Sequence, residues 1–187
     1  MTCDTFGKCP YSMVRGHYLQ LCELVKDWPC LIKGDIRTEV KSISENSKAV
    51  GQQLIFCAKQ GQQFNGMQFV SEAISNGAVC IAVDDEQFYE SFQLDIPIVW
   101  VPNLRRFIAY AAAALNHFPT EAIQVVAVTG TNGKTSTTNF VYQLLSHLQK
   151  KVVLVGTNGI FYNGAPLNTK YSNLTTISAI EFQSLVK

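Results

Sequence analysis

Apolar and polar residues along the chain form patterns that predict strands and helices in alternation. Two short, continuous apolar runs, at residues 78–83 and 96–101, have the length of buried strands. Residues 54–58 predict a third buried strand, and the alternation of apolar and polar positions over residues 38–44 predicts a fourth. Because helical patterns lie between these runs, the sequence predicts an α/β fold.

Three helices are predicted in this first part of the chain. An early helix stops before Pro29, a second ends at Gly77, which suits a left-handed cap, and a third starts after Asn103, a good N-cap residue. The early helix has its apolar residues at Val14, Tyr18, Leu21, Cys22 and Val25. The second carries Phe69, Val70, Ala73 and Ile74. The third buries Leu104, Phe107, Ile108, Ala111, Ala112 and Leu115 on one face.

A proline and several polar residues interrupt the pattern over residues 116–122, as in a short interdomain hinge. We therefore predict one domain over residues 1–118 and a second over residues 119–187. The second begins with a strand at 124–129 and a glycine-containing loop, and a strand at 151–157 completes a right-handed βαβ crossover. The helix between these strands has its predicted core stripe at Val141, Leu144, Leu145 and Leu148. A further helix starts within residues 175–187, so this parallel α/β domain is incomplete.

Composition and charge exclude several classes of function. The formal net charge of +1 and the absence of long like-charge runs argue against binding to nucleic acid or to an anionic membrane. The longest apolar run, residues 107–115, is far shorter than the ~20 residues that cross a bilayer. The N-terminus has no signal-peptide core, so we expect a cytoplasmic protein whose six cysteines are reduced thiols.

The stretch VTGTNGKTS, residues 128–136, carries the clearest chemistry. Its glycines allow several backbone N–H groups to converge on an anion, and the following helix adds its positive dipole end. Lys134 is placed to reach the β- and γ-phosphates of ATP, and the Thr135 hydroxyl to bind the Mg²⁺ of the nucleotide. The predicted nucleotide-binding residues are Gly130, Thr131, Asn132, Gly133, Lys134, Thr135 and Ser136. Val128 stands where the general G-x-x-x-x-G-K-[ST] pattern has its first glycine, and a tight turn bearing a surface lysine is the alternative interpretation.

Residues 128–137, VTGTNGKTST, closely resemble the ATP-binding loop of the Mur ligases. Residues 33–58 resemble the start of the N-terminal domain of the MurE type, the UDP-N-acetylmuramoyl-tripeptide synthetases, with its Gly-Asp, Asp-Ser-Arg and Leu-Phe-x-Ala segments. Residues 64–83 are similar to the D-G-x-x-F…A-x-x-x-G-A segment of that type, and residues 173–182 to its T-T-P segment. The resemblance covers most of the chain from about Tyr18 onward.

This resemblance implies an ATP-dependent ligase that makes peptidoglycan precursors in the cytoplasm. Such an enzyme adds an amino acid, of the diaminopimelate or lysine type, to UDP-N-acetylmuramoyl-L-alanyl-D-glutamate through an acyl phosphate. The resemblance implies ATP and Mg²⁺ as cofactors, Lys134 as the catalytic residue, and a monomer when the protein is complete. It further implies that Thr175 and Thr176 meet the muramoyl substrate and that Ser47 contacts its uridine-diphosphate end.

The chain departs from the family pattern in three ways. Asn46-Ser47-Lys48 replaces Asp-Ser-Arg, so a single ammonium group stands where a two-pronged guanidinium grips phosphate. Ile177 replaces the proline of the T-T-P segment, and the family continues well beyond this sequence. Glu181 is the one acidic residue after Glu121, and we interpret it as a solvated helix residue. The three histidines, His17, His117 and His147, are interpreted as surface residues.

Three functions follow from these observations. The first is the front part of a MurE-type ligase, which lacks the carboxylate that would hold the metal. The second is a chain that binds nucleotide or UDP-sugar without catalysis. The third is a small-molecule kinase, which shares the G-K-[ST] loop but usually begins with it, whereas here a whole α/β unit precedes the loop.

Overall fold

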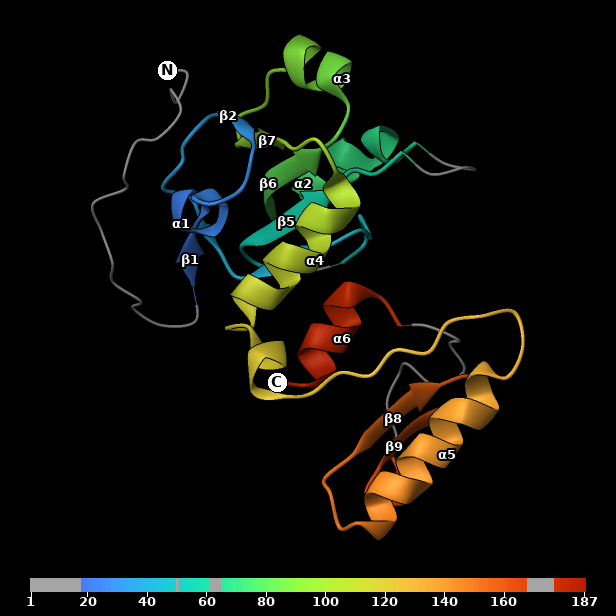
Figure 1. The fold of residues 1–187 in the computed structure, drawn as a ribbon. Helices are drawn as coiled ribbons and strands as arrows, with labels where there is room; N and C mark the ends of the chain where they lie inside the picture. The colour runs from blue at the N-terminus through green and yellow to red at the C-terminus, as the bar shows by residue number, and fades with distance from the viewer. Residues whose placement is uncertain (1–17, 50, 61–64, 168–176) are drawn as a thin grey trace. The chain divides into compact units, whose positions relative to one another are not determined.

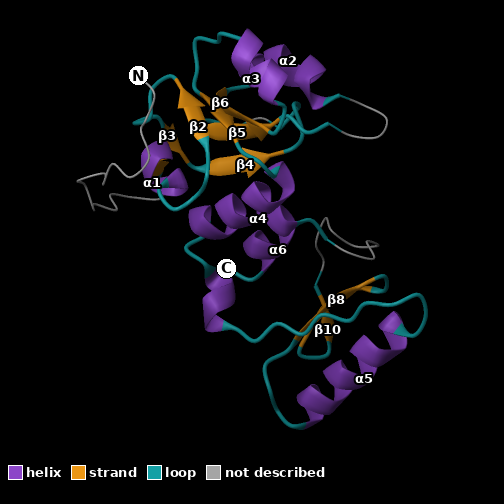
Figure 2. Ribbon diagram, turned by 45° about the horizontal axis from the view of Figure 1, so that its top comes forward, coloured by secondary structure: helices purple, strands orange, loops and turns teal. Residues whose placement is uncertain are grey.

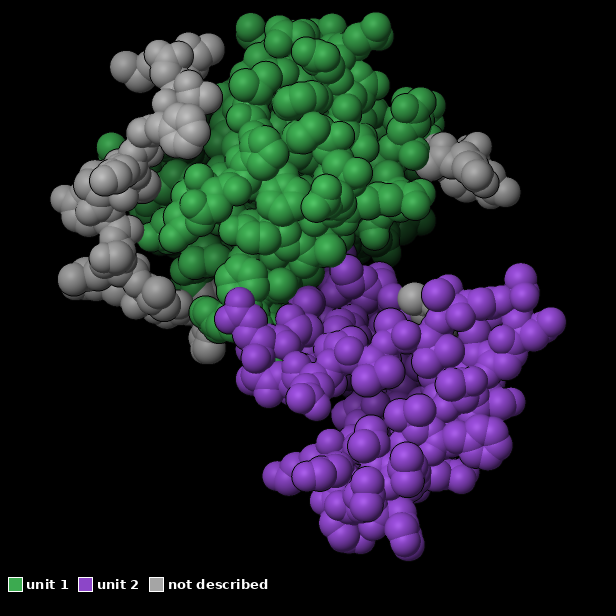
Figure 3. All heavy atoms as spheres, in the orientation of Figure 1, with its two compact units in different colours: residues 1–119 green, residues 120–187 purple. Residues whose placement is uncertain are grey.

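The computed structural model describes residues 18–49, 51–60, 65–167 and 177–187. The chain divides into two compact units, residues 1–119 and residues 120–187 (Figure 3). Strands and helices alternate in the first unit, so the predicted α/β class is confirmed. None of the described helices combines the length and the apolar character that a membrane span requires.

The first unit is built on a five-stranded sheet in the order β2-β7-β6-β5-β4. Strands β4 to β7 run parallel to one another, and β2 joins the edge antiparallel to β7. The strands are β2 (Leu31–Lys33), β4 (Ser42–Ser44), β5 (Leu54–Cys57), β6 (Ala78–Val83) and β7 (Ile98–Trp100). A separate two-stranded ladder pairs β1 (Leu19–Gln20) with β3 (Glu39–Val40).

Helices cover both faces of this sheet (Figure 2). Helices α2 (Val70–Ser75) and α3 (Glu86–Ser91) lie on one face, and α1 (Leu21–Val25) and α4 (Leu104–Leu115) lie on the other (Figures 1 and 2). A 3₁₀ turn, η1 (Gly66–Phe69), leads into α2. Both sides of the parallel strands are thereby buried, which explains why β5 and β6 are continuous apolar runs in the sequence.

Most elements predicted for this unit are confirmed. Strand β6 has the predicted bounds, and α4 buries all six residues of the predicted face. The Asn103 side chain caps α4 by accepting a hydrogen bond from the Arg106 amide at 3.0 Å. Gly77 follows α2 with a φ of +101°, as predicted for a left-handed cap. The predicted strand at residues 38–44 is divided into β3 and β4, and the early helix is only five residues long.

The second unit contains helix α5 (Lys134–His147) and a three-stranded sheet in the order β10-β9-β8. Its strands are β8 (Val153–Gly156), β9 (Gly159–Tyr162) and β10 (Ala165–Pro166). A short helix, α6 (Ala179–Leu185), ends the unit, as predicted. A 3₁₀ turn, η2 (Pro119–Ala122), lies at the division between the two units.

Two predictions for the second unit are wrong. Residues 124–129 form no strand and are largely exposed, with Val125 at 55% and Val126 at 69%. A strand needs a hydrogen-bonded neighbour. The predicted neighbour of residues 124–129 was the strand at 151–157, but that strand, β8, pairs antiparallel with β9. The predicted βαβ crossover is therefore absent from the described residues. The predicted core stripe of α5 is also not buried, because Leu144 is 60% exposed and Leu148 57% exposed.

Candidate functional site

The loop before α5 turns at two glycines. Gly130 has a φ of +147° and Gly133 a φ of +78°, backbone angles that residues with a Cβ rarely adopt. Gly133 is also the N-cap of α5. An added Cβ at Gly133 would meet no heavy atom within 4 Å, so the glycine meets a backbone requirement rather than a steric one. The glycine spacing thus fixes the point at which the loop enters the helix.

Lys134, the first residue of α5, folds back over this loop. Its ammonium group donates hydrogen bonds to the carbonyl oxygens of Gly130 at 2.5 Å and Thr131 at 3.2 Å. The Thr137 amide donates to the Gly133 carbonyl at 2.9 Å, which is the start of the helical ladder. The amides of the three preceding helix residues point out of the N-terminus, where an anion is favoured. The loop therefore places a cation and free amides together.

The first turn of α5 presents the remaining loop side chains to solvent. Thr131, Asn132, Thr135 and Ser136 are all exposed. The Thr138 hydroxyl donates to the carbonyls of Lys134 at 3.0 Å and Thr135 at 3.1 Å, which braces this turn from within. The structure thus brings all seven predicted nucleotide-binding residues into one exposed loop and turn.

The second unit provides few groups that could hold a metal ion beside Thr135. Glu181 forms a capping box with Ser178 at the start of α6: its carboxylate accepts from the Ser178 amide at 3.0 Å, and its own amide donates to the Ser178 hydroxyl at 3.2 Å. Glu181 thus has a structural role at a helix start. Within the described residues, no group of three or more His, Cys, Asp or Glu side chains is placed to hold a metal. Among the described residues, the Thr135 hydroxyl can therefore serve as a ligand of Mg²⁺, but no carboxylate is placed to bind the ion beside it.

The histidines offer no catalytic arrangement in the described part of the chain. His117 and His147 are both exposed, as predicted, and His117 has a φ of +62° just after α4. His17 lies outside the described residues.

Ser47 occupies a tightly bonded position in the first unit. It lies in the connection that follows the carboxyl end of β4 and is 8% exposed. Its hydroxyl donates to the Glu72 carboxylate at 2.5 Å, and the Asn76 side-chain amide donates to its carbonyl at 2.8 Å. The contact between Ser47 and the uridine-diphosphate end of a substrate stays a prediction.

Sequence reasoning missed Glu72 and Asn76, which hold Ser47. Glu72 lies within α2 and Asn76 is its C-cap residue. Because they are four positions apart, their side chains lie on the same side of the helix. The sequence did contain a signal for this arrangement: Glu72 and Asn76 are two polar residues with helical spacing beside the apolar face of the predicted helix. What the sequence could not indicate is that this side meets the loop after β4.

Two lysines follow the neighbouring parallel strands β4 and β5, and they differ in their ion-pair partners. The Lys59 ammonium, beyond the end of β5, pairs with the Glu45 carboxylate at 3.2 Å. Lys48 is exposed and makes no ion pair with any residue that the structure describes. Both lysines lie after the carboxyl ends of parallel strands, which is where open α/β sheets bind ligands.

The other two predicted substrate-binding residues, Thr175 and Thr176, lie outside the described residues. Ser47 belongs to the first unit and the loop at residues 130–136 to the second. The structure therefore describes two separate candidate regions.

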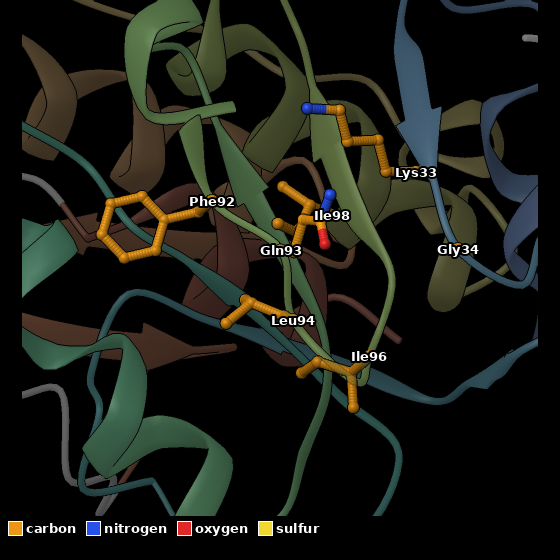
Figure 4. A pocket seen from close by; sticks show the side chains of 7 residues that line it. All are labelled: Lys33, Gly34, Phe92, Gln93, Leu94, Ile96 and Ile98. Carbon is orange, nitrogen blue, oxygen red and sulfur yellow. The ribbon is translucent and has the colours of Figure 1, made fainter. Parts of the chain in front are cut away.

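A cavity of about 310 Å³ lies elsewhere in the first unit, between β2, β7 and the connection after α3 (Figure 4). It is lined by Lys33, Gly34, Phe92, Gln93, Leu94, Ile96 and Ile98. The Lys33 ammonium already donates to the carbonyls of Tyr89 at 2.5 Å and Glu90 at 3.1 Å. The cavity contains none of the predicted site residues, and its lysine is used to hold the end of α3.

Comparison with known proteins places both regions in one family. The model of the Mur ligase middle domain matches residues 128–187, and the model of the Mur ligase family, catalytic domain, matches residues 39–116. The first match includes the loop with Lys134, and the second includes Ser47 and the parallel sheet.

Curated relatives match over most of this chain. The chain is 32% identical over 157 residues to a UDP-N-acetylmuramoyl-L-alanyl-D-glutamate–2,6-diaminopimelate ligase 2 of Clostridium acetobutylicum, which covers 84% of this chain and 32% of that protein. It is 33% identical over 153 residues to UDP-N-acetylmuramyl-tripeptide synthetase 2 of Oceanobacillus iheyensis, covering 82% of this chain and 30% of the relative. The chain thus spans about a third of the length of these relatives.

A solved structure of a UDP-N-acetylmuramoyl-L-alanyl-D-glutamate–2,6-diaminopimelate ligase has the same fold, with a TM-score of 0.66. The similarity covers 90% of this chain and 33% of that one, at 21% sequence identity. A second structure, of MurF from Acinetobacter baumannii, matches 70% of this chain and 28% of its own, with a TM-score of 0.53 and 22% identity. At these identities the likeness concerns the fold alone.

Proposed function

Because the chain belongs to the Mur ligase family, we propose that the protein is an ATP-dependent ligase of peptidoglycan precursor synthesis. The reaction adds an amino acid, of the diaminopimelate or lysine type, to UDP-N-acetylmuramoyl-L-alanyl-D-glutamate through an acyl phosphate. The names of the curated relatives support this reaction class and these substrates. Such precursors are cytoplasmic, and the protein acts there as a monomer.

The position of the Lys134 ammonium is the observation that carries the ATP part of the proposal. It lies over a loop bounded by Gly130 and Gly133, at the N-terminus of a helix of 14 residues. In the proposal, the loop amides and the helix dipole bind the phosphate oxygens of ATP. Lys134 exchanges its loop carbonyls for the β- and γ-phosphates and neutralises charge as the γ-phosphoryl group moves to the substrate carboxylate.

Mg²⁺ supplies further charge neutralisation when it is bound with the nucleotide. The Thr135 hydroxyl, exposed on the first turn of α5, is the group of this chain proposed to ligate it. A carboxylate is also needed, and Glu181 is occupied by its capping box. We therefore propose that residues 130–136 bind the nucleotide. The complete ligase reaction is proposed for the whole protein.

The first unit is proposed to bind the muramoyl nucleotide. The family match over residues 39–116 supports this assignment, as does the position of Ser47 after the carboxyl end of a parallel strand, where open α/β sheets bind ligands. Ser47 belongs to the uridine-diphosphate end of the site, and Thr175 and Thr176 to the muramoyl peptide. Binding without catalysis is the second candidate for the isolated chain, and the engagement of Glu181 in a helix cap favours it.

Isothermal titration calorimetry of the 187-residue chain tests the proposal with two ligands. We expect Mg²⁺-ATP to bind and adenosine not to bind, because the cradle recognises phosphate. We expect the UDP-muramoyl dipeptide to bind independently of ATP. A chain that binds neither ligand contradicts the proposed function. A chain that consumes ATP and forms the amide on its own contradicts the division between binding here and catalysis in the whole protein.

A further inference from the structure

The side chain and the backbone carbonyl of Ser47 are held by residues of one short helix, α2, and of its C-cap position, Asn76. The hydroxyl donates to Glu72 at 2.5 Å, and the carbonyl accepts from the Asn76 side chain at 2.8 Å. These partners are 25 and 29 residues away along the chain, so they fix the loop after β4 against α2. Ser47 itself is only 8% exposed, and both contacts are part-buried.

The same loop is also fixed from within. The Ser44 hydroxyl accepts from the Asn46 amide at 3.0 Å, and the Asn46 side chain accepts from the Lys48 amide at 3.0 Å. The Ala49 amide donates to the Asn46 carbonyl at 3.0 Å. The loop at residues 45–49 is therefore a closed turn whose central residue is anchored to α2.

Because the Ser47 hydroxyl is bonded to Glu72, a different group of this loop must bind an anionic ligand. The Ser47 hydroxyl proton is directed at Glu72, so it does not point at a phosphate. Lys48, the next residue, is exposed and has no ion-pair partner among the described residues, whereas Lys59, after β5, is paired with Glu45. Lys48 is thus the cation of this loop that a diphosphate can recruit.

We propose that Glu72 and Asn76 are positioning residues that act through Ser47 to present Lys48 to the diphosphate of a nucleoside diphosphate ligand. This inference rests on the proposed function of the first unit. Glu72 holds the Ser47 side chain, Asn76 holds its backbone, and the turn then sets the direction of the Lys48 side chain. A lysine has four rotatable side-chain bonds, so a fixed backbone is what limits where its ammonium group can reach.

UDP itself is the probe that tests this arrangement, titrated calorimetrically into the full 187-residue chain. We expect Glu72→Ala to weaken UDP binding about tenfold, because the anchored turn is released. Glu72→Gln keeps an oxygen that accepts from the Ser47 hydroxyl, so its dissociation constant should stay within about threefold of the wild type. Ser75→Ala, on the same helix, is the control, since its hydroxyl donates within α2, to the Ser71 carbonyl.

A double-mutant cycle separates positioning from a general loss of structure. Lys48→Ala should weaken UDP binding about as much as Glu72→Ala, and the double variant should be no weaker than Lys48→Ala alone. Ser47→Ala gives a second route to the same turn, and we expect it to behave as Glu72→Ala does. Tryptophan fluorescence of each variant monitors the fold of the first unit in parallel, because Trp28 and Trp100 both lie there.

The outcomes distinguish the two proposals. A wild-type chain that binds no UDP contradicts the substrate proposed for the first unit and the ligand of this loop together. A wild type that binds UDP while Glu72→Ala binds it equally well contradicts only the role of Glu72. Fully additive losses in the double variant also overturn that role, because they show Glu72 and Lys48 acting independently.

Discussion

The ammonium nitrogen of Lys134 lies 2.5 Å from the carbonyl oxygen of Gly130, so the first residue of α5 closes back onto the start of its own loop. This contact joins two residues four positions apart and depends on the left-handed turn at Gly133 between them. The cation is thereby kept at the mouth of the loop, beside the free amides of the helix N-terminus.

Replacing Lys134 by alanine should weaken Mg²⁺-ATP binding to this chain at least about tenfold, because a charge-assisted contact to phosphate is lost. Calorimetry measures the effect. Lys151→Ala is the matched control, since Lys151 is an exposed lysine in the same unit outside the loop. In the whole ligase we expect Lys134→Ala to abolish turnover. Equal ATP affinity in the wild type and in Lys134→Ala would remove this lysine from the nucleotide site.

Replacing Gly66 by alanine should destabilise the first unit by about 2 kcal/mol or more. A methyl group there would lie 2.6 Å from both the amide nitrogen and the carbonyl oxygen of Lys59, whose backbone cannot yield easily. Gly51→Ala is the control, because its nearest contact, the Ser42 hydroxyl, would be 4.0 Å away. Urea denaturation followed by tryptophan fluorescence reports the first unit alone, and similar midpoints for the two variants would contradict the prediction.

Alkaline pH should destabilise the first unit through two buried thiols. Burial raises the pKa of Cys57 and Cys80 above the usual 9.0, and for Cys57 the nearby carboxylates of Glu45 and Asp84 raise it further. Above pH 9 the unfolded chain therefore loses protons that the folded chain keeps, so the free energy of unfolding falls as pH rises. We expect a loss of about 1 kcal/mol per thiol between pH 8 and pH 10.

Urea denaturation at several pH values measures this loss, with a Cys57→Ala/Cys80→Ala double variant as the reference. The double variant should show a shallower decline over the same pH range, because its unfolded chain lacks the two ionising thiols. An unchanged slope would assign the alkaline sensitivity to other groups.

The exposed apolar face of α5 should contribute little to the stability of this chain. Phe140, Leu144 and Leu148 are 57–70% exposed, so Leu144→Ala removes few contacts and should cost less than about 0.5 kcal/mol. Leu154→Ala, on β8, removes a side chain that is only 7% exposed and should cost about 2–5 kcal/mol. Hydrogen exchange of peptides from β8 and β9 compares the two variants, and an equal increase in exchange would show that Leu144 is packed after all.

The sequence alone determined the elements whose signals are local. Helix α4 was predictable because its cap, Asn103, and its buried face both lie within thirteen consecutive residues. Strand β6 was predictable because burial on both faces leaves a continuous apolar run. The loop before α5 was predictable because its shape depends on the backbone freedom of Gly130 and Gly133. That freedom is a property of a single residue and can be read directly from the sequence.

Tertiary structure alone decided which segments meet. Residues 124–129 have the composition of a strand but no neighbour in the described structure, and β8 pairs with β9 instead. In the same way, the hydrogen-bond acceptor of the Ser47 hydroxyl is Glu72, 25 positions away. A hydrogen-bond partner that is distant along the chain leaves no periodic pattern in the sequence, because many segments could satisfy the same donor or acceptor and packing selects among them.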